Sequence, residues 1–197
     1  MPRDTRSIEP ADIIDARAYA EQRKELRARQ VEAKRLRRLS VGPHVTVFFE
    51  SWDSMWLQVQ EMLYIERGGD AQVADEIAAY GPMVPNGREL TATLMFEIDD
   101  PALRASVLGS LGGVERHIYI HVGETRIAAV PEGDVERSRD DGKASSVHFL
   151  HFPFSDAALA EWKSGRGSAI FGIDHPNYGH MAIVGSAMRA ELARDFV

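Results

Sequence analysis

The 197-residue sequence contains no cysteine. Disulfides, thiolate nucleophiles, iron–sulfur ligation and thiolate zinc sites are therefore excluded, and any metal must be bound by histidine, carboxylate or backbone oxygen. The sequence also lacks an apolar run of roughly 18 residues, the length that a membrane-spanning helix needs. Its beginning, MPRDTRSIEP, has charge without a following apolar stretch, so no secretory signal is recognised. We expect a cytoplasmic protein that does not enter a membrane.

The signatures of the common enzyme classes are missing as well. The sequence has no Gly-rich phosphate loop, no Gly-x-Ser-x-Gly elbow, no His-Glu-x-x-His and no EF-hand. The segment from Leu108 to Gly113 is rich in glycine, but it lacks the lysine and the preceding strand of a phosphate loop. A hydrolase or nucleotide enzyme of a common type is therefore not expected.

The composition is that of an ordinary globular protein, with 44% hydrophobic and 27% charged residues. The charge is unevenly divided, because residues 1–38 have a net charge of +4 and residues 39–197 have a net charge of −11. We predict two parts. Residues 1–38 form an N-terminal charged helix that serves as an arm or docking helix, and residues 39–197 form an α+β domain.

The N-terminal helix is predicted from Glu9-Pro10 to about Arg38, without an internal glycine. Its apolar stripe of Tyr19, Leu26 and Ala33 is narrow, so we expect the helix to lean on the body or on a second copy of the chain. Its basic residues could neutralise phosphates, but interleaved glutamates interrupt any positive face. We predict docking, including assembly into a homo-oligomer, and not nucleic-acid binding.

Alternating and β-branched patterns predict strands over residues 44–50, 88–98, 116–122, 125–130, 147–152 and 169–173. Helices are predicted over residues 52–67, 70–80, 101–111, 156–163 and 186–196, and an exposed loop over residues 131–145. Because helices interrupt the strands, the predicted fold class is α+β. It has a mainly antiparallel sheet of about five to six strands, helices packed on that sheet and the long charged N-terminal helix.

The stretch FFESWDSMWLQVQEML, Phe48 to Leu63, combines two tryptophans with amide and carboxylate groups on one predicted helix. Trp52 and Trp56 are four residues apart and belong to one buried stripe. Gln58 and Glu61 are three residues apart, so their side chains can reach the same point. Two interpretations remain open. The helix either has a solvated polar side, or it directs Glu61 into a pocket against the sheet.

The histidine-rich strands do not chelate a metal by themselves. His117 and His121 share a strand face but lie about 13 Å apart, and His148 and His151 point to opposite faces because their spacing is odd. Glu97 could join His117 and His121 on one polar sheet face. That face is either solvent-exposed or lines a ligand site.

A further candidate is the loop from Asp174 to His180. Pro176 and Gly179 predict a tight turn here, which would fold His175 and His180 toward each other. Such a loop could bind metal or substrate, or use its histidines for hydrogen bonds.

Residues along most of the chain also match a known family pattern. The matching positions are Phe49-Glu50, Trp56, Gln58 to Leu63, Glu66-Arg67, Glu76-Ile77, Tyr80, Val84-Pro85, Leu90 to Ile98, and Asp174 to Pro176 with the terminal helix. In these residues the chain resembles the bacterial family called domain of unknown function 3501. The resemblance implies an accessory role in peroxide or redox metabolism, beside a rubrerythrin-like or iron–sulfur redox protein.

Three hypotheses follow. In the first, the chain is an accessory or ligand-binding protein of peroxide or redox metabolism, with a polar pocket between residues 52–67 and the sheet. The pocket would use Gln58, Glu61, Arg67, Glu97 and His175, and Arg67 would neutralise a carboxylate or bind an anionic ligand bidentately. In the second, Glu61, Glu97 and His175 bind a divalent ion such as iron, manganese or zinc in a metal-dependent enzyme. In the third, the chain is a structural homo-oligomer assembled through the N-terminal helix.

Overall fold

The computed structural model describes residues 5–133 and 143–197. Its helices are α1 (Ala16–Lys34), α2 (Trp52–Glu66), α3 (Asp70–Tyr80), α4 (Pro101–Gly109), α5 (Asp156–Ser164) and α6 (Ser186–Leu192). Short 3-10 helices lie at Pro10–Asp12, Gly81–Met83, Val114–His117 and Ala193–Asp195. The strands are β1 (Arg38–Val41), β2 (Val45–Phe49), β3 (Glu89–Phe96), β4 (Ile118–Val122), β5 (Thr125–Ala128), β6 (Val130–Pro131), β7 (Val147–Pro153), β8 (Ala169–His175) and β9 (Tyr178–Ile183). The loop predicted for residues 131–145 lies largely outside the described residues.

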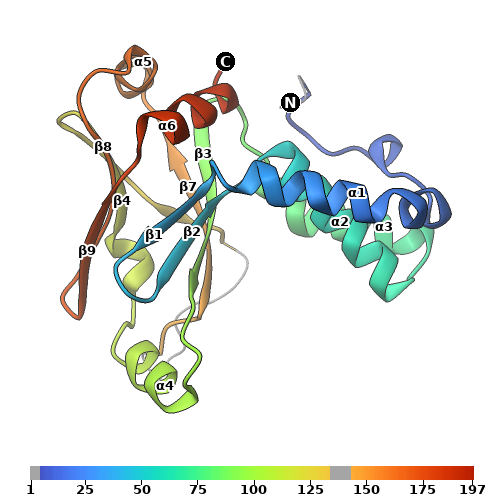
Figure 1. Cartoon of the computed structure of the whole chain (residues 1–197), viewed down its shortest axis with the longest axis horizontal. Coiled ribbons are helices and arrows are strands. Elements are labelled where there is room, and N and C mark those ends of the chain that lie inside the picture. The colour runs from blue at the N-terminus through green and yellow to red at the C-terminus, as the bar shows by residue number, and fades with distance from the viewer. Residues whose placement is uncertain (1–4, 134–142) are drawn as a thin grey trace.

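The α+β class is confirmed, but the strands form two sheets instead of one. A five-stranded sheet has the order β1-β2-β3-β7-β6, and a four-stranded sheet has the order β5-β4-β8-β9. All strand pairs are antiparallel, and the two sheets face each other (Figure 1). Alternation along a strand tells which side chains share a face, but it does not tell which strands pair. The predicted antiparallel pairing is confirmed, and the division of the strands into two sheets was not predicted for this reason.

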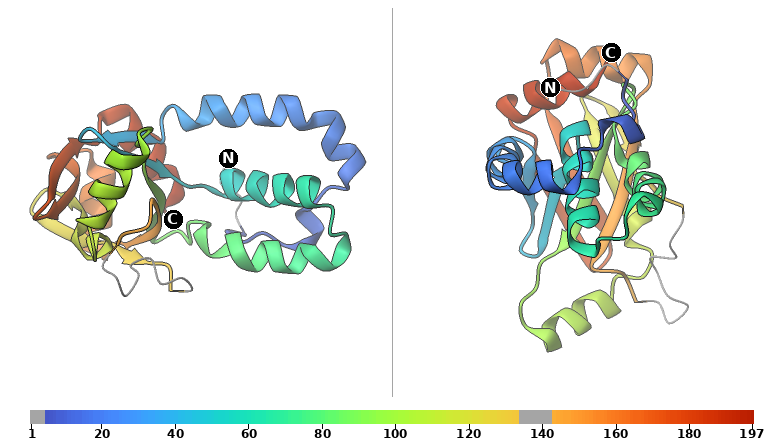
Figure 2. Two further views of the ribbon diagram at one scale, coloured as in Figure 1. Left: turned by 90° about the horizontal axis from the view of Figure 1, so that it is seen from below. Right: turned by 90° about the vertical axis from the view of Figure 1, so that its right-hand side faces the viewer.

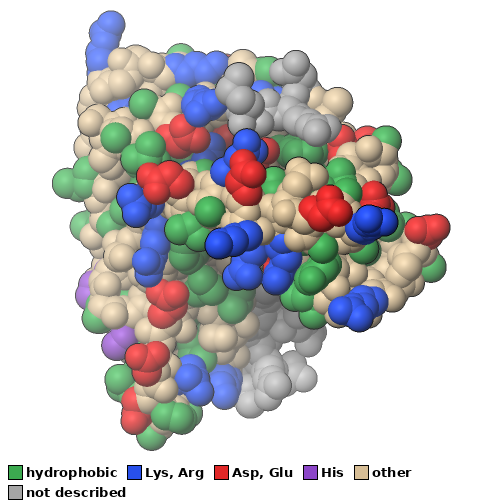
Figure 3. Space-filling view, turned by 45° about the vertical axis from the view of Figure 1, so that its right-hand side comes forward, with side chains coloured by type: hydrophobic (Ala, Val, Ile, Leu, Met, Phe, Trp, Pro, Cys, Tyr) green, Lys and Arg blue, Asp and Glu red, His purple; other side chains and the backbone are tan. Residues whose placement is uncertain are grey.

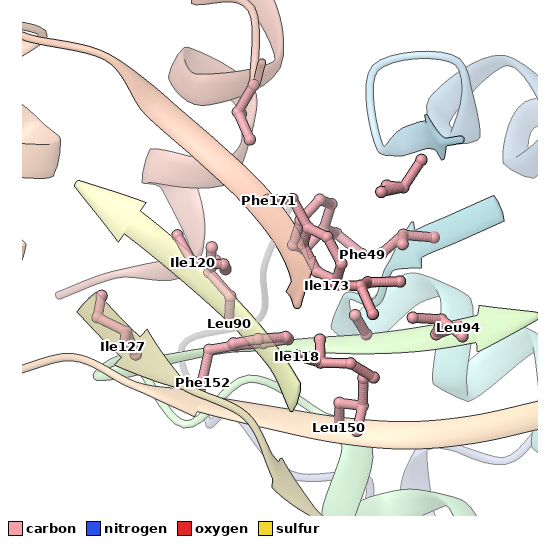
Figure 4. Close-up of a cluster of buried hydrophobic side chains, with 14 of the residues drawn as sticks. Phe49, Leu90, Leu94, Ile118, Ile120, Ile127, Leu150, Phe152, Phe171 and Ile173 are labelled. Carbon is pink, nitrogen blue, oxygen red and sulfur yellow. The ribbon is translucent and has the colours of Figure 1, made fainter. Parts of the chain in front are cut away.

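The core lies between the two sheets. Its central side chains are Phe49, Leu90, Leu94, Ile118, Ile120, Ile127, Leu150, Phe152, Phe171 and Ile173 (Figure 4). Phe171 of β8 meets the other sheet edge-on, with ring centroids 6.1 Å from Phe49 and 5.6 Å from Phe152. These aromatic contacts join the sheets into a sandwich, because edge-to-face ring pairs add to the free energy of apolar burial.

Segment 5–15 and helices α1, α2 and α3 form a second body, here called the helical lobe, which projects from one end of the sandwich (Figures 1 and 2). It has its own apolar cluster of Ile8, Trp52, Met55, Val59, Met83 and Val84. Helix α2 leaves the sandwich directly after β2, α3 returns to it, and α1 runs back along α2 to β1. None of the described helices combines the length and the apolar character needed to cross a bilayer.

Three side chains of α2, those of Trp52, Trp56 and Gln60, form hydrogen bonds to the N-terminal segment 5–15. Trp52 Nε1 donates to the carbonyl of Ser7 at 2.6 Å, and Trp56 Nε1 donates to the carbonyl of Asp12 at 2.9 Å. One turn further, the Gln60 amide oxygen accepts from the Ile14 N–H at 2.7 Å and its nitrogen donates to the Ile14 carbonyl at 3.3 Å. Because these three side chains are spaced by four residues, one stripe of the helix satisfies the backbone of segment 5–15.

Helix α1 carries charges of both signs on its exposed side. Arg17 pairs with Glu21 at 3.6 Å, and Arg29 pairs with Glu25 at 3.4 Å. On the face of the molecule in Figure 3, Lys and Arg side chains lie among Asp and Glu side chains instead of gathering in one basic area. This mixed charge favours docking over nucleic-acid binding, because interspersed carboxylates repel the phosphate backbone.

Candidate functional site

Glu61 faces α1 and not the sheet. Its carboxylate accepts two hydrogen bonds from Arg23, each 2.8 Å long, and a short one from the Tyr19 hydroxyl. The Arg23 hydrogen bond lowers the pKa of Glu61, whereas burial together with the Glu61 carboxylate raises the pKa of Tyr19. The carboxylate is therefore held ionised in a structural pair that fastens α1 to α2.

Glu97 directly follows Phe96, the last residue of β3, and β3 pairs with β2. It accepts a hydrogen bond from the Thr46 hydroxyl and forms an exposed ion pair with Arg38 at 3.4 Å. Helix α2 follows β2, and the last residue of β2, Phe49, pairs with Ala92 of β3. Because β2 and β3 are antiparallel, α2 lies near the first residues of β3, at the end away from Glu97. The structure does not bring Glu61 and Glu97 together.

His175 belongs to the four-stranded sheet. Its Nδ1 accepts the N–H of Asn177 at 3.2 Å, and its buried ring meets His117 edge-on at 5.1 Å. The predicted loop over residues 174–180 is a β8–β9 hairpin, in which His175 pairs with Tyr178 and His180 pairs with Ile173. The two imidazoles share one face of the hairpin, but each ring packs on another partner: His175 on His117, and His180 on Tyr178 at 4.5 Å.

The predicted metal ligands thus lie in three separate parts of the molecule. Among residues 5–133 and 143–197, no group of three His, Asp or Glu side chains could hold a metal ion. The polar face predicted to join Glu97 with His117 and His121 is not formed either, because β3 and β4 belong to different sheets. The enzyme hypothesis based on Glu61, Glu97 and His175 is not carried forward.

Gln58 and Arg67 are the remaining predicted site residues. The Gln58 amide lies 3.5 Å from the Tyr80 hydroxyl, at the limit of a hydrogen bond. Arg67 follows the last residue of α2, with a left-handed φ of 57°, and its N–H donates to the Leu63 carbonyl at 3.1 Å. Arg67 also lines a pocket, and this pocket is the candidate site.

The pocket lies at the end of the helical lobe farthest from the sandwich, where the start of α1, the end of α2 and the start of α3 meet (Figure 2). Its volume is ≈ 530 Å³. The lining residues are Ile13, Ile14, Asp15, Ala16, Arg17, Tyr19, Gln60, Leu63, Tyr64, Arg67, Gly69, Asp70 and Val73. Two parts of the chain that are far apart in the sequence, residues 13–19 and 60–73, therefore build one concave site.

The lining of this lobe pocket is mostly apolar, and three of its polar side chains, Gln60, Tyr19 and Asp15, already have partners. Gln60 bonds the backbone of Ile14, and the Tyr19 hydroxyl bonds Glu61. Asp15 caps α1 by accepting from two backbone N–H groups at 3.0 Å. What remains is a wall of isoleucine, leucine, valine and tyrosine, with Tyr19 and Tyr64 edge-on at 5.8 Å. Such a wall accepts an apolar group without leaving a buried polar atom unpaired.

Sequence reasoning named Arg67 for a pocket against the sheet, and it did not name the apolar residues that line the lobe pocket. The glycines Gly68-Gly69 predict the tight connection that sets the start of α3 against the end of α2. No sequence feature places Ile13 and Ile14 at a pocket, because the pattern predicts a continuous helix over these residues. Only the hydrogen bonds from α2 to segment 5–15 place them at the pocket.

A separate polar cluster lies on the outer face of the five-stranded sheet. His151 of β7 points away from the core, as its odd spacing from buried His148 predicts. Its Nδ1 lies 3.1 Å from Glu89, and its Nε2 lies 2.7 Å from Glu132. Two carboxylates facing both ring nitrogens favour the imidazolium, which donates to each of them. Hydrogen bonding, first to Glu89 and then to Glu132, raises the pKa of His151.

We expect the contribution of His151 to stability to fall as pH rises. Its folded pKa is raised above the ordinary value of 6.5. The stabilisation is therefore complete below about pH 6.5 and is lost as pH rises through the folded pKa. The unfolding free energies of the wild type and His151→Gln, measured in urea, should differ more at about pH 6 than at about pH 9. Glu132→Gln should shrink that difference, and an equal difference at both pH values would contradict the assignment.

The chain is similar to a known family and to a solved structure. Residues 7–196 match the family described as "Protein of unknown function (DUF3501)". The chain belongs to this family. A crystal structure of a novel protein of unknown function from Burkholderia pseudomallei is 34% identical to this chain, with a TM-score of 0.90 over 97% of this chain and 100% of that chain. The two proteins therefore share the fold over nearly their whole length. A search of the curated proteins finds no match.

Proposed function

We propose that this protein is a ligand-binding accessory protein, and that its ligand places an apolar body in the lobe pocket. The supporting observation is a mostly apolar pocket of ≈ 530 Å³ in which the Gln60 amide and the Tyr19 hydroxyl are already hydrogen-bonded to other parts of the chain. Volumes of about 300–1,000 Å³ are typical of sites that enclose a small molecule. Binding there would bury apolar surface on both sides, which is the main favourable term of such association.

The residues around the pocket favour binding over catalysis. Among the described lining residues there is no histidine, serine, threonine or lysine. The Tyr19 hydroxyl is held by Glu61, and the Asp15 carboxylate is occupied as a helix cap. Catalysis by a general base, or by a nucleophile that a base activates, needs a proton-accepting side chain within reach of the reacting atom. The pocket supplies no obvious pair of this kind.

The biological context comes from the family resemblance alone. It implies peroxide or redox metabolism and a rubrerythrin-like or iron–sulfur partner, and both stay predictions. Assembly into a homo-oligomer and a cytoplasmic location stay predictions too. Within one chain, α1 already packs on α2 through Tyr19 and Arg23. On its exposed side α1 leaves Val31, which is 64% exposed, as an apolar residue for a further contact.

Binding of a neutral apolar dye, N-phenyl-1-naphthylamine, tests the pocket. We expect saturable fluorescence enhancement with the full-length protein. Val73→Trp and Ala16→Trp fill the pocket from opposite walls, and each should weaken binding about tenfold or more. Ala16 is exposed at the first turn of α1, so this variant is expected to fold normally. Val31→Trp makes the same change as Val73→Trp on the outside of the lobe and should bind the dye like the wild type.

Two results would count against the proposal. One is the absence of saturable dye binding to the wild type. The other is unchanged binding by both filling variants, with far-UV circular dichroism equal to that of the wild type. Either result would mean that an apolar ligand does not occupy this pocket.

A further inference from the structure

We infer that the ligand of the lobe pocket is an organic acid, with its apolar body inside the pocket and one anionic group at the rim, paired with Arg67. This inference rests on the proposed function and names the chemical class of the ligand. It follows from the state of the charged groups around the opening.

Two carboxylates line the pocket, and each lies at the start of a helix, where the helix dipole favours a negative charge. Asp15 accepts hydrogen bonds from the N–H groups of Arg17 and Ala18 at the start of α1. Asp70 is the first residue of α3, where the positive end of the helix dipole favours a negative charge. Neither carboxylate therefore needs a cation from a ligand.

The two arginines at the rim are less well satisfied. Within the described part of the chain, no hydrogen bond or ion pair reaches the Arg67 guanidinium, and its side chain is exposed. Arg17 pairs with Glu21 at 3.6 Å, with both side chains largely in solvent, and such a pair contributes little. Arg67 is thus a cation at the opening that has no ionic partner in the described part of the chain. A carboxylate or sulfonate fits it, because a guanidinium donates two parallel N–H bonds to such a group.

The backbone of Arg67 supports the same assignment. A non-glycine residue at a φ of 57° is uncommon and costs free energy. Glycine is the usual residue in this conformation after the end of a helix. The position therefore carries a guanidinium where a glycine would suit the backbone better. Replacing Arg67 with glycine removes the cation without straining the fold, so it separates a binding role from a structural one.

The test uses two dyes that share one apolar body. 1-Anilinonaphthalene-8-sulfonate is N-phenyl-1-naphthylamine with an added sulfonate. We expect the wild type to bind the anionic dye at least about fivefold more tightly than the neutral one, and added salt to reduce this preference. Arg67→Gln and Arg67→Gly should abolish the preference, because they weaken binding of the anionic dye far more than binding of the neutral dye. Arg29→Gln, at an exposed arginine elsewhere on the lobe, should keep the preference.

Competition between three ten-carbon amphiphiles tests which charge on the head group the pocket prefers. Decanoate should displace the anionic dye from the wild type at least about fivefold more effectively than decanol, and decyltrimethylammonium should be the weakest competitor. The advantage of decanoate should vanish in Arg67→Gly, whose melting temperature should equal or exceed that of the wild type.

The outcomes separate the two proposals. Equal affinities for both dyes, unchanged by Arg67→Gln, would overturn the organic-acid inference and leave the apolar pocket in place. Tighter binding of decyltrimethylammonium than of decanoate would overturn it as well. Failure of the neutral dye to bind would instead contradict the pocket itself, whatever the anionic dye does.

Discussion

Replacing Arg37 with methionine should lower the free energy of unfolding by about 3–5 kcal/mol, because it leaves a buried carboxylate without its cation. The Arg37 guanidinium donates to both oxygens of Asp195 at 2.8 and 2.9 Å and to the Glu50 carbonyl at 3.0 Å. The side chains of Arg37 and Asp195 are only 6% and 2% exposed. Burial raises the pKa of Asp195, and the guanidinium opposes that rise.

This ion pair also joins three parts of the chain: the residue before β1, the end of β2 and the C-terminal 3-10 helix. The helical lobe enters and leaves the sandwich here, so loss of the pair should loosen the junction. Breaking a buried pair is costly even though forming one contributes little net stability, since a single desolvated charge remains.

The adjacent residue provides the control for this prediction. Arg38 pairs with Glu97 at 3.4 Å, but both side chains are about half exposed, at 53% and 47%. Arg38→Met should therefore cost less than about 1 kcal/mol. The double variant Arg37→Met with Asp195→Leu should recover much of the loss, because it removes the stranded charge as well. Urea denaturation followed by tryptophan fluorescence measures all three, and an Arg37→Met loss below about 1 kcal/mol would contradict the buried-pair argument.

Phe171→Ala should destabilise the protein by a similar amount, about 3–5 kcal/mol, through a cavity at the centre of the sandwich. Phe171 is fully buried, at 0% exposure, and it contacts rings from the opposite sheet at Phe49 and Phe152. Close-packed interiors relax only partly around a deleted ring, so the lost contacts are not replaced.

Its neighbour Ile170 is the matched control, because it points to the opposite face of β8 and is partly exposed. Ile170→Ala should cost about 1 kcal/mol or less, since little apolar surface is removed from burial. Guanidinium chloride unfolding of both variants gives the comparison. A larger loss for Ile170→Ala than for Phe171→Ala would mean that the four-stranded sheet presents its other face to the core.

Local patterns predicted most of the regular structure. The alternation predicted over residues 88–98 corresponds to β3, whose residues Leu90, Ala92 and Leu94 are all fully buried. The helix predicted over residues 52–67 corresponds to α2, which Ser51 caps by accepting a hydrogen bond from the Ser54 N–H. Such features depend on residues close together in the chain, and a single sequence contains that information.

The same reasoning failed where pairing partners are distant. The continuous helix predicted over residues 9–38 is a 3-10 turn, a break at residues 13–15, α1, and then β1. The four residues of β1 have little strand pattern of their own, and they are extended because they pair with β2. Segment 5–15 leaves the helical state because Trp52, Trp56 and Gln60 bond its backbone. Tertiary hydrogen bonds here outweigh a weak local preference.

By itself the sequence determined the absence of thiol chemistry, the α+β class and the positions of most elements. Only the tertiary structure decided that the strands divide into two facing sheets, that Glu61 is tied to Arg23 and not to Glu97, and that an apolar pocket opens between three helices. The physical reason is the range of the interactions. Periodicity and capping act within a few residues, whereas strand pairing, ion pairing and pocket formation depend on which distant surfaces meet.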